Sequence, residues 1–138
     1  MEENGRFAMK GSIPVTETVN TVVFICPHGA GMSRLAAAFF NEVAPVGWQA
    51  TSAGLEPAEA VSAVAVALVA GSPTETYLDH ARPRPMAQAT GTRTIAINCT
   101  VSGADRWDLA ANTLGEAMSN ELRSRAAHLA KELADVCP

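Results

Sequence analysis

The stretch from Thr21 to Phe40 constrains this chain more than any other part of the sequence. Its first residues, 21–25, are β-branched or aromatic and have the length and composition of a buried strand. A turn-rich segment with two glycines follows at 26–33, and the alanine- and leucine-rich residues after it are typical of a helix. A strand, a glycine loop and a helix in this order bring backbone N–H groups and a helix N-terminus together on an anion.

Cys26 ends the predicted strand. It would therefore lie at the floor of the loop, where positive potential favours a thiolate over a thiol. The sequence accordingly predicts a thiolate that faces an oxyanion. A small buried cysteine with no chemical role is the alternative that the residue type leaves open.

Composition narrows the class of protein. The chain has 138 residues, 48% of them hydrophobic and 17% charged, which indicates one globular domain. A net charge of −4 argues against nucleic acid as a partner, and no apolar run approaches the roughly 20 residues that span a membrane. The three cysteines have neither a disulfide framework nor zinc-ligand spacing, and the N-terminus does not look like a signal peptide. We therefore expect free thiols in the cytoplasm, with no metal and no cofactor.

The rest of the chain alternates between strand and helix patterns. Residues 1–20 are polar and predict a flexible N-terminal tail before a domain at 21–138. Further strands are predicted at 48–52, 94–98 and 106–109, and further helices at 60–70 and 115–136. This order predicts a single-domain α/β fold with a four-stranded parallel sheet and helices on both of its faces.

Two nucleotide-binding motifs fail on the loop. The phosphate-binding pattern Gly-x4-Gly-Lys-Ser/Thr has Cys26 at its first glycine and Met32 at its lysine, so that only Gly31 and Ser33 match. The dinucleotide fingerprint fails because Gly29-x-Gly31 lacks the third glycine. The loop is therefore not predicted to bind a nucleotide.

The loop does resemble that of the low-molecular-weight tyrosine phosphatases and the related thioredoxin-coupled arsenate reductases. Their pattern is a strand, then Cys-x5-Arg-Ser, then a helix, and Cys26 and Ser33 match its two ends. The resemblance implies that Cys26 is the catalytic nucleophile and that Ser33 assists it. It assigns anion binding to the other loop residues, namely His28, Gly29, Ala30, Gly31, Met32 and Arg34.

The resemblance continues along most of residues 21–135. Ser-Ala-Gly at 52–54 matches the family after its second strand, and the segment at 79–83 is similar to a later loop. Trp-Asp-Leu at 107–109 is similar to the segment before the general acid. The strand that ends near Cys99 resembles the one before a resolving cysteine in the reductases, which implies a redox role for Cys99.

Three departures from the family pattern bear on activity. The loop arginine falls on Met32, which removes a charged donor typically worth about 3–4 kcal/mol in the transition state. The general-acid aspartate falls on Ala110 or Ala111, a further loss of about a hundredfold to ten-thousandfold. A second reductase cysteine has no counterpart between Cys99 and Trp107.

Two functions therefore remain open from the sequence. The first is a thiolate-based protein that binds phosphate, arsenate or a similar oxyanion and hydrolyses phosphate esters or reduces arsenate with a thiol reductant protein. The second is a catalytically silent relative that binds an anion or a partner protein. Cys26 and Ser33 favour the first function, whereas Met32 and Ala110-Ala111 favour the second. Arg34 or an arginine at 82 or 84 could replace the charge that is lost at Met32.

Overall fold

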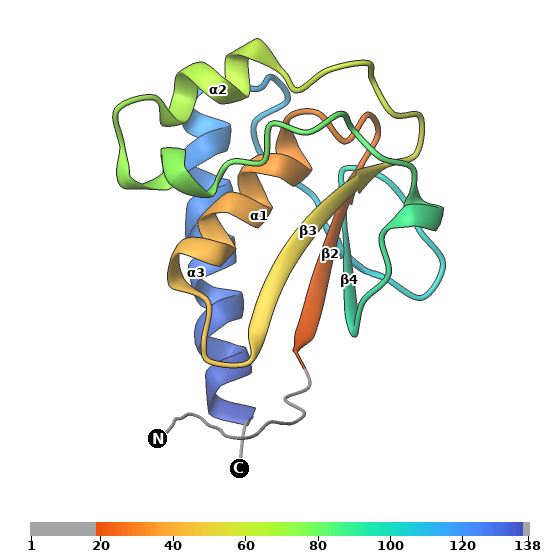
Figure 1. Cartoon of the computed structure of the whole chain (residues 1–138), viewed down its shortest axis with the longest axis vertical. Coiled ribbons are helices and arrows are strands. Elements are labelled where there is room, and N and C mark those ends of the chain that lie inside the picture. The colour runs from red at the N-terminus through yellow and green to blue at the C-terminus, as the bar shows by residue number, and fades with distance from the viewer. Residues whose placement is uncertain (1–18, 137–138) are drawn as a thin grey trace, which may run out of the picture.

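The structure is built on a four-stranded, all-parallel sheet with the strand order β3-β2-β4-β5. Figure 1 labels three of these strands, β3, β2 and β4. The computed structural model describes residues 19–136, so the predicted tail, apart from its last two residues, lies outside the described residues. The strands are β2 (Asn20–Cys26), β3 (Trp48–Gly54), β4 (Arg93–Ile97) and β5 (Asp105–Trp107). The predicted α/β fold and its four-stranded parallel sheet are confirmed.

Strand β2 lies in the middle of the sheet and positions Cys26. It pairs with β3 along its whole length, which sets Cys26 opposite Gly54, and it pairs with β4 so that Ile25 lies opposite Ala96. Because all the strands are parallel, their carboxyl ends meet at one edge of the sheet. Cys26, Gly54 and the residues after Ile97 therefore lie at the same edge.

Three helices pack on one face of the sheet, not on both as the sequence suggested. They are α1 (Met32–Val43), α2 (Ala63–Val69) and α3 (Glu116–Val136). All three join Val22, Phe24 and Cys26 of β2 in the larger core, because alternate residues of a strand point to the same face. The opposite face carries a small cluster of Val23, Ile25 and Ala53, against which Ala89, Cys99 and Val101 pack.

Helix α1 follows the loop and is buried almost all round, from Ser33 to Phe40. Its alanines let it lie close to the sheet and to α3, and it ends at Ala44, which precedes a proline and adopts an extended conformation. Helix α2 is shorter than the predicted 60–70 because Ser62 caps it, accepting a hydrogen bond of 3.3 Å from the Ala65 amide.

Two short 3₁₀ turns, η1 (Pro73–Tyr77) and η2 (Met86–Gln88), lie in the long connection between α2 and β4. No helix within residues 19–136 has both the length and the apolar character needed to cross a membrane.

Candidate functional site

Cys26 and Ser33 lie together at the two ends of the loop. The Cys26 side chain is buried, and its Sγ receives a hydrogen bond of 3.2 Å from the Gly29 amide. The Cys26 thiol donates to Ser33 Oγ at 3.1 Å, and the Ser33 hydroxyl donates to the Ala53 carbonyl at 3.5 Å. When Cys26 loses its proton, the Ser33 hydroxyl can donate to the sulfur instead, which would stabilise the thiolate.

The carbonyl groups of the loop point outward, where other segments bind them. The carbonyls of Pro27, His28 and Ala30 accept hydrogen bonds of 2.8–3.0 Å from the amides of Glu56, Ala58 and Ser62, and Arg34 Nε binds the Gly29 carbonyl at 3.0 Å. The segment at 55–62 thus holds the loop from outside.

This outward binding turns the loop amides inward. In a trans peptide unit the N–H points opposite to the C=O, and the described residues contain no cis peptide. The Gly29 amide follows this rule, because the His28 carbonyl points outward while the Gly29 N–H reaches Cys26 Sγ. The amides of His28, Ala30 and Gly31 are therefore directed to the same side of the loop as the cysteine sulfur.

The first turn of α1 adds further unbound donors. Gly31 caps the helix without a side-chain hydrogen bond, and a helix leaves its first N–H groups unpaired. Within residues 19–136, no group accepts a hydrogen bond from the amides of His28 or of residues 30–34. A concave set of free N–H groups at a helix N-terminus favours an anion.

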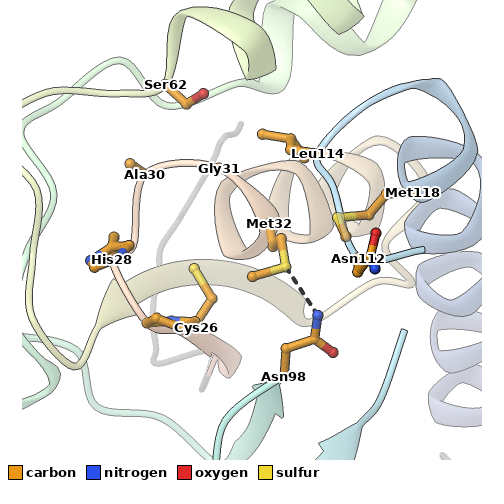
Figure 2. Close-up of a pocket in the computed structure, with 11 residues that line it drawn as sticks. Cys26, His28, Ala30, Gly31, Met32, Ser62, Asn98, Asn112, Leu114 and Met118 are labelled. Carbon is orange, nitrogen blue, oxygen red and sulfur yellow. Dashed lines mark hydrogen bonds between the residues drawn. The ribbon is translucent and has the colours of Figure 1, made fainter. Parts of the chain in front are cut away.

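A pocket of about 340 Å³ opens over Cys26 (Figure 2). It is lined by Cys26, Pro27, His28, Ala30, Gly31, Met32, Ser62, Asn98, Asn112, Leu114 and Met118. The lining contains no carboxylate, no lysine and no arginine. Within residues 19–136, no three His, Cys, Asp or Glu side chains gather as a metal site.

Met32 occupies the position of the family's loop arginine and faces this pocket. Its Sδ accepts a weak hydrogen bond of 3.6 Å from Asn98 Nδ2 (Figure 2), and Asn98 Oδ1 accepts from the Leu109 amide at 2.9 Å. Asn98 has a positive φ of 54°, a conformation that asparagine adopts more readily than most residues. Asn98 therefore joins the end of β4 to the pocket.

Sequence reasoning missed six of the lining residues. They are Pro27, Ser62, Asn98, Asn112, Leu114 and Met118. Asn98 carried a usable signal, because it directly follows a strand whose carboxyl end lies at the binding edge. Asn112 lies one or two residues after the positions where the family's general acid falls, but no sequence pattern predicted an amide there.

His28 lies at the open side of the loop. Its Nδ1 is 3.1 Å from the Glu56 carbonyl, and a carbonyl oxygen can only accept a hydrogen bond. Nδ1 therefore carries the proton in this contact, which in a neutral ring leaves Nε2 as an acceptor.

The arginines near the site lie outside the pocket. Arg34 is 1% exposed, and its side chain runs behind the loop to Gly29 and to the Asp79 carbonyl, 2.5 Å from Nη1. The Asp79 carboxylate lies 3.8 Å from Arg34 Nη1 and 2.7 Å from Arg84 Nη2. Arg82 is exposed, and no arginine at 34, 82 or 84 lines the pocket.

Burial and neighbouring charges shift the pKa values of Arg34 and Asp79 in opposite directions. Burial lowers the pKa of Arg34, while Asp79 and Cys26 act to raise it. Burial also acts to raise the pKa of Asp79, but hydrogen bonds from Arg84 and the Ala81 amide and the charges of both arginines bring it below its usual value. The two arginines and one ionised carboxylate leave one net positive charge behind the loop.

Cys99 lies on the other face of the sheet and does not line the pocket. It packs against Val23, Ile25 and Ala53, and its thiol donates to the Ile25 carbonyl at 3.6 Å. Burial raises the pKa of Cys99, and the negative charge of the Cys26 thiolate raises it further. The structure thus brings Cys99 near Cys26 at the sheet edge without bringing the two side chains into one cavity.

The fold has known relatives, although no protein-family model matches the sequence and no curated protein does either. The thioredoxin-dependent arsenate reductase of Corynebacterium glutamicum superimposes with a TM-score of 0.70 at 23% identity, over 89% of this chain and 66% of that one. An arsenate reductase from Archaeoglobus fulgidus gives 0.61 at 25% identity, over 83% and 98% of the two chains. This is the fold of the low-molecular-weight phosphatases and arsenate reductases.

A low-molecular-weight protein tyrosine phosphatase from T. tengcongensis supports the same assignment. It has a TM-score of 0.59 at 17% identity and covers 86% of this chain and 99% of that one. The resemblance inferred from the sequence is confirmed for the fold. The chain spans about two thirds of the length of the Corynebacterium enzyme.

Proposed function

We propose that this protein binds a tetrahedral oxyanion on the loop at 26–34 and that Cys26 attacks the bound anion as a thiolate. One observation carries the proposal. The loop carbonyls are bound from outside, so that free amides converge beside the buried Cys26 sulfur. Structures with this fold include an arsenate reductase described in its phosphate-binding state, which supports an oxyanion as the ligand.

Arsenate reduction fits the pocket better than ester hydrolysis. An ester's leaving group needs a proton donor, and no carboxylate lines the pocket. Arsenate carries hydroxyl groups of its own, so that oxygen can leave as water when the Cys26 sulfur bonds to arsenic. A thiol reductant would then attack the Cys26 sulfur, forming a disulfide and releasing arsenite.

The loop residues take distinct roles in this chemistry. Backbone amides of residues 28–33 would bind the anion oxygens, and the Ser33 hydroxyl would stabilise the thiolate. The reductant would be a thiol protein, as it is for the thioredoxin-dependent relative. Free thiols at Cys26 and Cys99 suit a reducing compartment such as the cytoplasm.

A binding protein without catalysis is the second candidate. Met32 favours it, because it places a thioether in the pocket where the family pattern has a guanidinium. Both candidates share the anion site and differ only in turnover.

Titration calorimetry of the reduced protein with phosphate and arsenate, followed by an assay for arsenite release with a dithiol, tests the proposal. We expect both anions to bind and arsenite to form. Cys26→Ser should keep anion binding but abolish arsenite release. Cys99→Ser should also keep anion binding. Binding without release in the native protein would select the silent candidate, and the absence of any binding would contradict both.

A further inference from the structure

Arg34 is an unusual residue for the first turn of a buried helix. Its side chain is fully enclosed, and within residues 19–136 its Nη2 is a buried nitrogen without a hydrogen-bond partner. A buried unpaired donor on a charged group costs stability. An apolar side chain would avoid that cost, so packing alone does not account for a guanidinium here.

The guanidinium acts on a peptide unit of the anion loop. Arg34 Nε binds the Gly29 carbonyl at 3.0 Å, and that carbonyl shares its peptide unit with the Ala30 amide. A cation that binds the oxygen of a peptide polarises the N–H on its other side, because hydrogen bonds in a chain strengthen one another. The Ala30 amide, which faces the Cys26 side of the loop, therefore becomes a stronger donor.

The charge of Arg34 is only partly offset. Its Nη1 binds the backbone carbonyl of Asp79, while the Asp79 carboxylate makes its short contact of 2.7 Å with Arg84. Arg84 is held in turn by the Ser52 carbonyl at 2.8 Å and Thr51 Oγ1 at 3.1 Å. The two arginines and the Asp79 carboxylate are thus fixed behind the loop. The pocket in front of the loop is lined by no arginine, lysine or carboxylate.

We infer that Arg34 is a positioning residue that supplies, from behind the loop and through the Gly29–Ala30 peptide, the positive charge that Met32 does not supply in front of it. This charge stabilises the Cys26 thiolate and a bound oxyanion. The anion part rests on the proposed function, whereas the thiolate part stands without it.

Two variants in the same network give opposite expected results. Arg34→Met removes the cation, so the rate of Cys26 alkylation by iodoacetamide near pH 7 should fall about 3- to 10-fold, and phosphate should bind about 10-fold more weakly. Asp79→Asn removes the opposing charge but keeps the backbone carbonyl that binds Arg34. Alkylation and phosphate affinity should therefore rise by about 2- to 5-fold.

A merely structural role would not give opposite signs. Both variants remove contacts of the loop network, and loosening of the loop alone would shift Cys26 reactivity in one direction. Arg34→Lys keeps the charge without the planar fork, and we expect its alkylation profile against pH to stay near that of the native protein. This variant and Asp79→Asn keep the test valid if Arg34→Met does not fold.

The surface pair Arg93 and Asp105 provides the matched control. These residues form an ion pair of 2.9 Å where β4 and β5 begin, at the sheet edge opposite Cys26. Arg93→Met and Asp105→Asn should leave Cys26 alkylation unchanged. The inference is overturned if folded Arg34→Met alkylates like the native protein, or if Asp79→Asn and Arg34→Met shift the rate in the same direction.

The two proposals fail in different ways. One outcome is that the native protein binds no phosphate, while Arg34→Met lowers and Asp79→Asn raises the rate of Cys26 alkylation. The proposed function is then wrong, and the role of Arg34 at the thiolate holds. If phosphate binds with the same affinity to the native protein and to Arg34→Met, the anion site of the proposed function holds and the anion part of this inference does not.

Discussion

The side chain at position 32 sets the charge of the pocket. Met32 lines the space over Cys26, and its Sδ accepts a weak N–H···S bond from the Asn98 side-chain amide. A guanidinium at this position could bind two oxygens of one anion and keep its charge through the transition state. In the proposed function, the free loop amides would thus hold an anion without a cation beside it.

Met32→Arg should convert the pocket from neutral to cationic. We expect phosphate affinity to rise, and hydrolysis of aryl phosphates with good leaving groups to rise by about a hundredfold from one added donor. Poor leaving groups should gain less, because no acid lines the pocket. Calorimetry and a rate assay on both proteins measure this.

Met86→Arg, at an exposed methionine outside the pocket, is the control. A folded Met32→Arg protein that gains neither affinity nor rate would show that the loop is not an anion site.

At the scale of elements, β3 fixes the loop by direct backbone contact. A Cβ on Gly54 would lie 2.5 Å from the His28 carbonyl carbon, and a Cβ on Gly29, whose φ is +66°, would lie 2.7 Å from the Gly54 nitrogen. The strand end and the loop therefore touch where only glycine fits. This contact explains in physical terms why the Ser-Ala-Gly sequence at 52–54 ends in glycine.

Gly54→Ala should displace the loop, because backbone atoms on both sides cannot yield as a side chain would. We expect a loss of about 1–3 kcal/mol in the free energy of unfolding and weaker phosphate binding. Urea denaturation and calorimetry measure the two effects. Gly115→Ala is the control, because a Cβ there meets nothing within 4 Å. Equal stability and affinity in both variants would contradict the close contact.

The elements also show what the sequence could not reveal. Composition and spacing predicted the parallel sheet and placed Cys26 at the end of a strand, because these depend on short-range patterns. The resemblance to the phosphatase and reductase family implied that Ser33 lies beside Cys26. Alternation along β4 would set Cys99 on the same face as Ile97 and Cys26, but the positive φ of Asn98 ends the strand and turns Cys99 to the other face. The direction of the Arg34 side chain depends on Asp79, 45 residues away, which no local pattern encodes.

Formation of a disulfide between Cys26 and Cys99 should require movement of the segment at 98–104. The two thiols lie on opposite faces of the sheet, and a disulfide tolerates Cα separations of at most about 7 Å with suitable direction. With peroxide, we expect sulfenic acid at Cys26 before any disulfide, and faster pairing in mild urea. Peptide mapping over time in a Cys137→Ser background measures this. An immediate Cys26–Cys99 disulfide in native buffer would contradict it.

On the scale of the whole molecule, the network of Asp79 with its two arginines joins parts of the chain that lie far apart in sequence. Through Arg34 it reaches the loop and α1, and through Arg84 it reaches the end of β3. The Arg84 side chain binds the Ser52 carbonyl, and the Arg84 carbonyl accepts a hydrogen bond of 3.0 Å from the Gly54 amide. The anion loop and the sheet edge are therefore held partly by charge.

Asp79→Asn should make the fold less sensitive to acid. The pKa of Asp79 is lower in the folded protein than its ordinary value of 3.8, so its stabilising effect is complete above that value and is lost as the pH falls toward the folded pKa. The melting temperature of the native protein should exceed that of Asp79→Asn near pH 7, and the difference should shrink between about pH 5 and about pH 3. Because the carboxylate is 43% exposed, about 1 M salt should reduce the difference as well. Thermal unfolding across this range measures both effects, and a difference that stays constant with pH would show that the Asp79 charge does not stabilise the fold.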